Sequence, residues 1–316
     1  MPSMDMPLDQ LRQYKPSLYR QENFEVFWDH TVAEAMKQPL NAELIPYNLH
    51  ANNVTAYAVR FDGFGGGRLA GWYLQPETRG KRPGLCVYHG YSGRAPRPLD
   101  LLSIASQGVA VLSLDVRGQA GESTDAAVYP EGHQSGWMTL GIRDPNTYYF
   151  RYVYADALRA LELLARREEV DESRLAITGV SQGGGITLAV AALSERPVLA
   201  LADVPFLCDY RRAIEITPTH PYQEIPLFLK TYPHLYETAI RTLSYFDNVN
   251  LAPWIKARTI ISNCLCDDIC PPSTIFAAYH HIAAEKRIDV YPYHKHEVPY
   301  EHTEVRFREI METLNP

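Results

Sequence analysis

A serine between two glycines stands where an apolar run passes into a helical segment. The stretch Thr178-Gly179-Val180-Ser181-Gln182-Gly183-Gly184 follows Leu175-Ala176-Ile177 and precedes a run with helical character. In this context a Gly-x-Ser-x-Gly turn holds the serine on a sharp bend with its hydroxyl exposed, and the glycines let strand and helix approach closely. The pattern therefore predicts that Ser181 is a nucleophile for acyl transfer rather than only part of a tight connection.

A serine nucleophile needs a base and an acid. Its hydroxyl attacks weakly until an imidazole takes its proton, and a carboxylate must orient that imidazole. Both groups should follow the serine in the chain, just past the next strands. Asp267 and Asp268 follow the apolar run 259–263, and His294 and His296 follow the run 287–291. Local spacing alone does not decide between the two members of either pair.

Acyl transfer also needs hydrogen-bond donors for the negative oxygen that develops on the substrate. The predicted strand before His89-Gly90-Tyr91-Ser92-Gly93 leads into a glycine-containing loop that can present a backbone N–H. The second donor would be the N–H of Gln182 at the start of a helix, where the helix dipole favours negative charge. His89 could be mistaken for a catalytic base, but we expect it to be a structural residue of this loop.

Hydrophobic runs and turn residues outline the elements that must position these groups. The predicted strands are Val54–Arg60, Arg68–Leu74, Gly84–His89, Val109–Leu114, Arg174–Thr178, Val198–Asp203, Thr259–Asn263 and Arg287–Tyr291. The predicted helices are Gln21–Lys37, Pro98–Ser106, Thr147–Arg166, Gly183–Leu193, Pro272–Ala284 and Glu301–Thr313. The first two strands, parted by a glycine-rich turn, should form an antiparallel hairpin, and the others alternate with crossover helices. The predicted fold class is therefore α/β, with an eight-stranded, mostly parallel, doubly wound sheet.

Two segments fall outside this alternation. One is the N-terminal extension Met1–Pro46, and the other is the insertion Pro205–Pro253, which is rich in Pro and Tyr and follows the sixth predicted strand. The candidate serine, acid and histidine come from strand ends of one sheet, so we expect one domain over residues 1–316 rather than the two that length permits. The extension and the insertion should cover the site or form subunit contacts.

Composition and charge narrow the choice of partners. The chain has 316 residues, of which 46% are hydrophobic and 21% charged, as is typical of a globular protein. A net charge of −7 argues against nucleic acid, which requires a broad basic field. The sequence contains no signal-peptide core or membrane span, and its five cysteines are an odd set, three of them crowded into 264–270. These features predict a reduced, cytoplasmic protein with no membrane contact.

Three sequence blocks resemble one family. Asp115-Val116-Arg117-Gly118-Gln119, then Gly179–Gly183, then His296-Glu297 are similar to the signature blocks of carbohydrate esterase family 7, the acetyl xylan esterases and cephalosporin C deacetylases. Other stretches that resemble the family in order and spacing are His89–Arg94, Gly141–Pro145 with Tyr148-Tyr149, Pro205–Leu207, Arg211–Glu215 and Cys270–Thr274. The resemblance covers essentially the whole chain and implies the α/β-hydrolase fold.

The resemblance also implies a role for each candidate residue. The family's aspartate lies three residues before Cys270-Pro271-Pro272, so the acid would be Asp267, and the base would be His296. The amides that bind the oxyanion would be those of Tyr91 and Gln182. Residues implied to hold the site without taking part in the chemistry are Arg117, Gln119 and Glu297.

The activity implied by the resemblance is removal of acetyl groups from small molecules through an acetyl-serine intermediate. The expected substrates are acetylated xylo-oligosaccharides and other sugars, cephalosporin C and short acyl esters. The family also implies a homohexamer whose sites face an internal cavity, which would exclude polymeric xylan and suit a cytoplasmic enzyme. The alternative on the same scaffold is a broad short-chain carboxylesterase or a peptidase.

Two further alternatives belong to other classes of protein. A zinc site could combine cysteines and histidines of the C-terminal third, namely Cys264, Cys266, Cys270, His280, His281, His294 and His296. The spacing Cys-x-Cys-x₃-Cys lacks the pairing usual for zinc ligands, so we expect no metal and no cofactor. A binding protein without activity is disfavoured because the serine, acid, histidine and oxyanion loop are all present.

Overall fold

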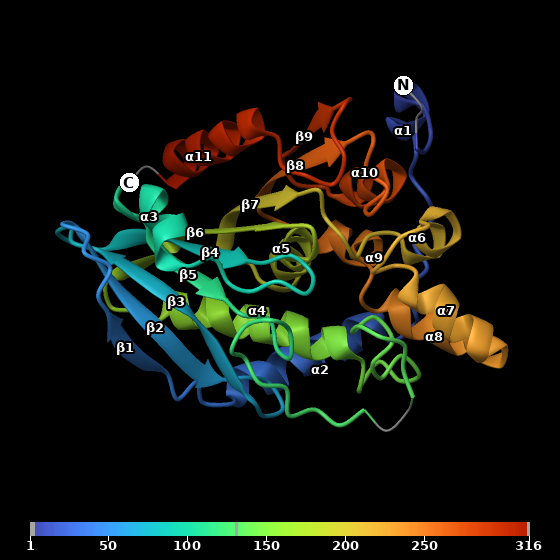
Figure 1. The fold of residues 1–316 in the computed structure, drawn as a ribbon, viewed down its shortest axis with the longest axis horizontal. Coiled ribbons are helices and arrows are strands. Elements are labelled where there is room, and N and C mark those ends of the chain that lie inside the picture. Colours follow the sequence, from blue (N-terminus) through green and yellow to red (C-terminus); the bar gives the residue numbers. More distant parts are fainter. Residues whose placement is uncertain (1–3, 130–131, 315–316) are drawn as a thin grey trace.

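The computed structural model describes residues 4–129 and 132–314. Among these residues, nine strands join one twisted sheet, in the order β1-β2-β3-β5-β4-β6-β7-β8-β9 (Figure 1). Their bounds are β1 Glu43–Tyr47, β2 Val54–Asp62, β3 Arg68–Pro76, β4 Arg82–Tyr88, β5 Ala110–Leu114, β6 Val170–Val180, β7 Pro197–Asp203, β8 Arg258–Cys264 and β9 Lys286–Tyr291. Pairing is antiparallel from β1 to β3 and between β3 and β5, and it is parallel for all the other neighbours.

Helices cover both faces of the sheet (Figure 1). On one face lie α3 (Pro98–Ala105) and α11 (Tyr300–Leu314), and on the other lie α4 (Tyr149–Ala165), α5 (Gln182–Leu193) and α10 (Pro272–His281). The N-terminal extension contributes α1 (Leu8–Leu11) and α2 (Phe24–Lys37). The insertion contributes α6 (Tyr210–Ile216), α7 (Glu224–Thr231), α8 (Tyr236–Ser244), α9 (Asn248–Leu251) and the short 3₁₀ turns Pro233–Leu235 and Ala252–Trp254.

The prediction of eight strands was wrong by one. All eight predicted strands are present as β2 to β9, but β1 adds an edge strand at the boundary of the N-terminal extension. Four of the five residues of β1 are exposed, so the strand lacks the apolar alternation by which strands are found. Its Pro46 also argues against a strand except at a sheet edge, which is where β1 lies.

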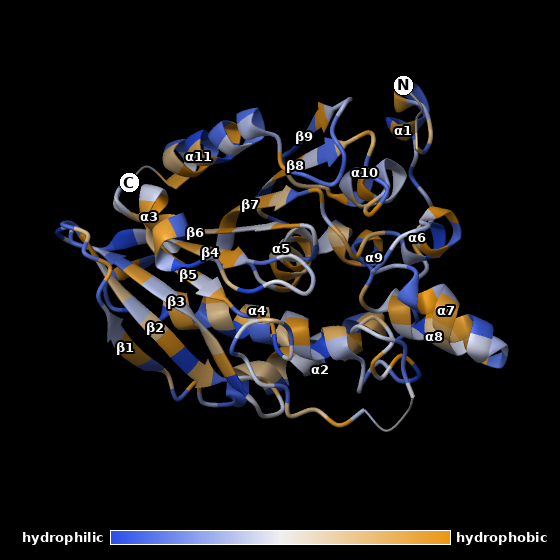
Figure 2. Cartoon of the chain, in the orientation of Figure 1, coloured by the Kyte–Doolittle hydropathy of each residue, from blue (hydrophilic) through white to orange (hydrophobic). Residues whose placement is uncertain are grey.

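The core is divided between the two faces of the sheet. Along β4, Leu85 and Val87 join the apolar cluster under α3 and α11, whereas Cys86 and Tyr88 join the cluster under α4 and α5. This is the two-residue period of a strand with both faces covered. Figure 2 shows apolar residues along the central strands and α5, and alternating apolar and polar residues along β2. The carboxyl ends of β4, β6 and β8 therefore come from a buried framework, and β9, at the sheet edge, is half-buried along its length.

The extension docks on the insertion. The indole N–H of Trp28 in α2 donates to the carbonyl of Tyr245 at 2.8 Å, and the Tyr14 hydroxyl donates to the Asp209 carboxylate at 2.9 Å. Rings of α2 pack edge-on against Phe246. The two segments outside the βα alternation thus support each other. No helix in the described ranges is both long and apolar enough to cross a membrane.

Candidate active site

Ser181 lies on a strained turn between β6 and α5. Its φ of +58° falls in the left-handed region that residues with a side chain rarely adopt. A Cβ on Gly183 would lie 2.0 Å from the carbonyl oxygen of Tyr88, and one on Gly179 would lie 2.4 Å from the backbone of Gly183. Only glycine fits at these two positions, which confirms the predicted close approach of strand and helix.

Three side chains from three strand ends form one hydrogen-bonded chain. His296, after β9, places Nε2 2.8 Å from the Ser181 hydroxyl oxygen, and its Nδ1 lies 2.8 Å from Oδ2 of Asp267, after β8. The two residues that spacing left as rivals lie elsewhere. Asp268 accepts the Thr219 hydroxyl through its backbone carbonyl, and His294 Nδ1 faces Glu297 at 3.1 Å.

The Asp267 carboxylate is fully buried, and each of its two oxygens has a hydrogen-bond partner. While Oδ2 faces His296, Oδ1 accepts the backbone N–H groups of Ile269 at 2.9 Å and Cys270 at 2.8 Å. The turn after β8 therefore fixes the direction of this side chain, so that Oδ2 is presented to His296.

The loop after β4 runs directly beside Ser181. A Cβ on Gly90 would lie 3.8 Å from the Cβ of Ser181. The Gly90 carbonyl accepts from His89 Nδ1 at 2.7 Å and from the Gly93 N–H at 3.0 Å. Because the peptide is planar and trans, the N–H of Tyr91 points away from those donors. In the described part of the chain, no hydrogen bond engages the N–H of Tyr91 or of Gln182.

His89 is held by the backbone through both ring nitrogens. Its Nε2 accepts the Val116 N–H at 2.9 Å, so the proton sits on Nδ1 and is donated to the Gly90 carbonyl. Burial lowers the pKa of His89, which favours this neutral form. The residue orients the Gly90–Tyr91 peptide, in agreement with the structural role expected for it.

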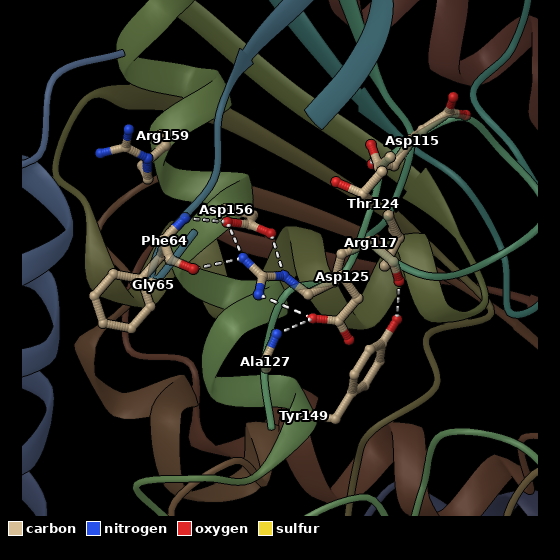
Figure 3. A network of polar contacts seen from close by, with 12 residues as sticks. Phe64, Gly65, Asp115, Arg117, Thr124, Asp125, Ala127, Tyr149, Asp156 and Arg159 are labelled. Carbon is tan, nitrogen blue, oxygen red and sulfur yellow. Dashed lines mark hydrogen bonds and ion pairs between the residues drawn. The ribbon is translucent and has the colours of Figure 1, made fainter. Parts of the chain in front are cut away.

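Arg117 and Gln119 lie behind the site, joined to one another by Tyr149. The fully buried Arg117 guanidinium forms paired bonds of 2.6 and 2.8 Å with Asp156, and it also contacts Asp125 and the Phe64 carbonyl (Figure 3). The Tyr149 hydroxyl donates to the Arg117 carbonyl at 2.6 Å and accepts from the Gln119 side chain at 3.1 Å.

Gln119 continues this network to the nucleophile turn. Its side-chain amide pairs with that of Gln182 through bonds of 2.8 and 3.2 Å. Glu297 is placed differently, because it is exposed and contacts His294 and the Lys295 N–H rather than the serine, the aspartate or His296. Its carboxylate therefore braces the outside of the loop that carries His296.

Glu224, whose carboxylate lies beside the loop that carries Tyr91, was not among the predicted site residues. It begins α7 in the insertion, and its carboxylate accepts the Tyr91 hydroxyl at 2.8 Å and the Met138 N–H at 2.9 Å. Burial raises the pKa of Glu224 to about 7. No sequence motif includes this residue. Its segment was noted only as an insertion outside the alternation of strands and helices.

The cysteines do not gather into a separate site. All five are free thiols. Across the described ranges, the single group of Cys, His and acidic side chains close enough to share an ion is Asp267, Cys270 and His296. Two of these three residues already belong to the hydrogen-bonded chain that leads to Ser181.

A serine on a strained strand-to-helix turn, joined to a histidine and an aspartate from later strand ends of a mostly parallel sheet, defines a hydrolase of the α/β-hydrolase fold. The chain belongs to the acetyl xylan esterase family, whose model matches residues 1–313. Membership of this family makes it a carboxylic ester hydrolase. The family resemblance predicted from the sequence blocks is thereby confirmed.

Two solved structures share nearly the whole fold. The acetyl xylan esterase from Paenibacillus sp. R4 is 46% identical, with a TM-score of 0.95, over 98% of this chain and 100% of that chain. Acetyl xylan esterase 1 from Thermoanaerobacterium sp. JW/SL YS485 is 33% identical, with a TM-score of 0.94, over 98% of this chain and 99% of that chain.

More distant relatives match only in part. Acetyl esterase Axe7A from Xylanibacter ruminicola is 25% identical over 289 residues, which are 89% of this chain but 65% of that protein. This chain therefore spans about two thirds of the length of that curated relative. An acylaminoacyl peptidase from Pyrococcus horikoshii is 20% identical, with a TM-score of 0.60, over 92% of this chain and 43% of the peptidase chain. This similarity shows the fold alone.

Proposed function

We propose that this protein is a serine esterase that removes acetyl groups from small acetylated molecules. One observation carries the proposal: two hydrogen bonds of 2.8 Å lead from Asp267 through His296 to the Ser181 hydroxyl. The oxyanion donors would be the amides of Tyr91 and Gln182, which lack hydrogen-bond partners among the described residues. In support, the loop that carries Tyr91 passes Ser181 at Gly90, and Gln182 follows Ser181 directly in the chain. A nucleophile, its base, the group that orients the base and two oxyanion donors are the parts that acyl transfer requires.

The reaction would proceed in two similar halves. His296 Nε2 takes the Ser181 proton as the oxygen attacks the acetyl carbonyl, while Asp267 holds the imidazole and stabilises its charged form. The amides of Tyr91 and Gln182 bind the oxygen that becomes negative. The alcohol leaves with the proton from His296, and water then attacks the acetyl-serine by the same route and releases acetate.

In this proposal Arg117, Gln119 and Glu297 act on the site through other residues. The buried ion pair of Arg117 with Asp156 fixes the loop after β5. Gln119, on the same loop, holds the Gln182 side chain through a hydrogen bond between the two amides. Glu297 steadies the loop of His296 through His294. None of the three contacts the Ser181 hydroxyl, so their effect on rate would pass through the position of the catalytic groups.

The substrates proposed are acetylated xylo-oligosaccharides and other sugars, cephalosporin C and short acyl esters. The support is the similarity to the structures of two acetyl xylan esterases over nearly their whole length. Assay of acetyl, butyryl and peptide substrates on one enzyme preparation tests the class, because specificity is the ratio of kcat/KM values. A higher kcat/KM for the butyryl or peptide substrate would contradict the proposal.

The Ser181→Ala variant tests the mechanism directly. Acetate release from an acetylated substrate should collapse, while Ser103→Ala, on an exposed turn of α3, serves as the matched control and should keep the parent rate. A fluorophosphonate probe should label the parent protein at Ser181 and leave Ser181→Ala unlabelled. Activity of Ser181→Ala near the parent level would show that another nucleophile does the work.

We also propose that the enzyme is cytoplasmic and assembles as a homohexamer. Five free thiols suit a reducing compartment. The hexamer rests on the family resemblance, with sites that face an internal cavity and admit only small substrates. Sedimentation analysis of the purified protein tests the assembly, and a monomer at micromolar concentration would contradict it.

A further inference from the structure

A buried glutamate of the insertion reaches the oxyanion loop. Glu224 is 2% exposed, and its two carboxylate oxygens lie 2.8 and 3.1 Å from the Tyr91 hydroxyl. The same hydroxyl accepts the Trp137 N–H at 2.6 Å, and the Met138 N–H donates to Glu224 at 2.9 Å. These contacts join three separate stretches of chain: the loop after β4, the loop before α4, and α7.

The surroundings of Glu224 fit a carboxylate closely. Gly136, with φ of +107°, passes so near that a Cβ there would lie 2.1 Å from the carboxylate. In the described part of the chain, no Lys, Arg or His forms an ion pair with Glu224, so hydrogen-bond donors alone hold it. Burying an acid without a cation is costly, and burial raises the pKa of Glu224 to about 7. Groups held at such a cost are concentrated at functional sites.

Tyr91 connects Glu224 to the reacting serine. Its ring packs edge-on against Trp137 and against Phe206, and the Phe206 N–H donates to the Ser181 carbonyl at 2.9 Å. Its own N–H belongs to the peptide that His89 orients beside Ser181. His89 therefore holds the backbone next to Tyr91, and Glu224 of the insertion holds the Tyr91 hydroxyl.

We propose that Glu224 is a positioning residue which, through the Tyr91 hydroxyl, keeps the amide of Tyr91 aimed at the oxyanion. The inference rests on the proposed esterase function. No hydrogen bond joins Glu224 to Ser181 or His296 among the described residues, and its contact with the oxyanion loop is the one to the Tyr91 hydroxyl. An oxyanion donor works fully only in the transition state, so loss of Glu224 should lower kcat and leave KM nearly unchanged.

A double-mutant cycle tests this path. Glu224→Gln keeps the shape but replaces one acceptor oxygen by a donor, and Tyr91→Phe removes the hydroxyl while keeping the backbone N–H. Each should lower kcat for an acetyl ester about tenfold, with KM changed less than about twofold. Because both remove the same contact, the double variant should be no slower than the slower single variant. An unchanged kcat in Glu224→Gln, or losses that multiply in the double variant, would overturn the proposal.

Controls separate positioning from general loss of structure. Glu309→Gln is the matched change, because Glu309 is also buried but pairs with Arg258 and Arg287 on the α11 side of the sheet. It should lower the unfolding midpoint and leave kcat per active site unchanged. If Glu224→Gln does not fold, Glu224→Asp replaces it, since the shorter side chain keeps the charge and withdraws its oxygens from Tyr91. Glu224→Asp should also lower kcat, and a parent kcat in this variant would overturn the proposal.

The same assay distinguishes the two levels of inference. A parent protein that releases no acetate contradicts the esterase function itself. An active parent with an equally active Glu224→Gln contradicts only the role of Glu224. Titration of the reactive serine with a fluorophosphonate gives kcat per active site, so a partly unfolded preparation is not counted as a slow enzyme.

Discussion

Replacing Asp267 by asparagine should keep the shape of the site and disable its histidine. The Oδ1 atom of Asp267 accepts the N–H groups of Ile269 and Cys270 at 2.9 and 2.8 Å. The asparagine oxygen must remain in front of these donors, so its NH₂ group faces Nδ1 of His296. Nδ1 must then accept a hydrogen bond, and the ring proton moves to Nε2. In that tautomer the imidazole cannot take the proton of Ser181.

The size of the loss in kcat is set by the wrong tautomer of His296 rather than by lost packing. The corresponding change in the well-studied serine protease triad lowers kcat about 10⁴-fold with the geometry intact. A factor of about 10⁴ corresponds to about 5.5 kcal/mol of transition-state stabilisation. The free energy of unfolding should change by only about 1 kcal/mol, because both backbone donors keep a partner. Activity should thus fall far more than stability.

The assay is acetate release per titrated active site, together with urea unfolding of the same preparation. Asp268→Asn is the matched control one residue along the chain, and it should stay within about twofold of the parent rate. A large loss in Asp268→Asn with a small one in Asp267→Asn would refute the reasoning and make Asp268 the acid. A loss below about tenfold in both variants would show that the imidazole needs neither carboxylate.

Three other perturbations test the framework. Asp156→Asn removes the charge opposite the buried Arg117 and should cost about 3 kcal/mol of stability in urea unfolding, and a change near zero would contradict the role of this ion pair. The pKa of Glu224 is raised from 4.5 to about 7, so the folded state holds a proton that the unfolded state releases, and stability should fall as pH rises from about 4.5 to about 7. After allowance for solvent screening, the free energy of unfolding should fall by about 1–2 kcal/mol over this pH range. Thermal unfolding measured at several pH values should show a smaller fall in Glu224→Gln than in the parent protein. Equal pH slopes in the two proteins would contradict the raised pKa of Glu224. Gly183→Ala would place a Cβ 2.0 Å from a carbonyl oxygen and should destabilise by about 3 kcal/mol or prevent folding, whereas parent-like unfolding would mean that the turn can relax.

The sequence indicated the nucleophile better than its partners. Ser181 lies in a motif whose meaning is local, because strand, turn and helix follow one another in the chain. The acid and the base each had a rival within two residues, and only the family resemblance chose between them. Asp267 differs from Asp268 because its Oδ1 accepts two N–H groups of its own turn while its Oδ2 meets His296, 29 residues along the chain. The first contact is local, but the second depends on the tertiary structure that brings the ends of β8 and β9 together.

The errors in the fold prediction have a similar origin. β1 is exposed at the sheet edge and therefore carries no periodic signal. β6 begins at Val170, four residues before the predicted start, because the polar residues that open it lie at the sheet surface and have no apolar run. In contrast, the β5 run, buried at every position, was predicted to within one residue. Burial on both faces leaves a sequence signal in β5, and the exposed strand β1 lacks one.

Glu224 shows why part of a site escapes motif analysis altogether. Its environment needs the missing side chain of Gly136, the backbone N–H of Met138 and the hydroxyl of Tyr91, three groups that come from two other loops. A glutamate in a Pro- and Tyr-rich insertion gives no sign that it will be buried among them. Two contacts therefore hold the loop after β4: His89 binds its backbone at Gly90, and Glu224 of α7 binds the Tyr91 hydroxyl. We therefore expect substitutions in α7 that displace the Tyr91 hydroxyl to lower kcat even where their cost in stability is small, and kinetics and urea unfolding of the same variants measure the two effects separately.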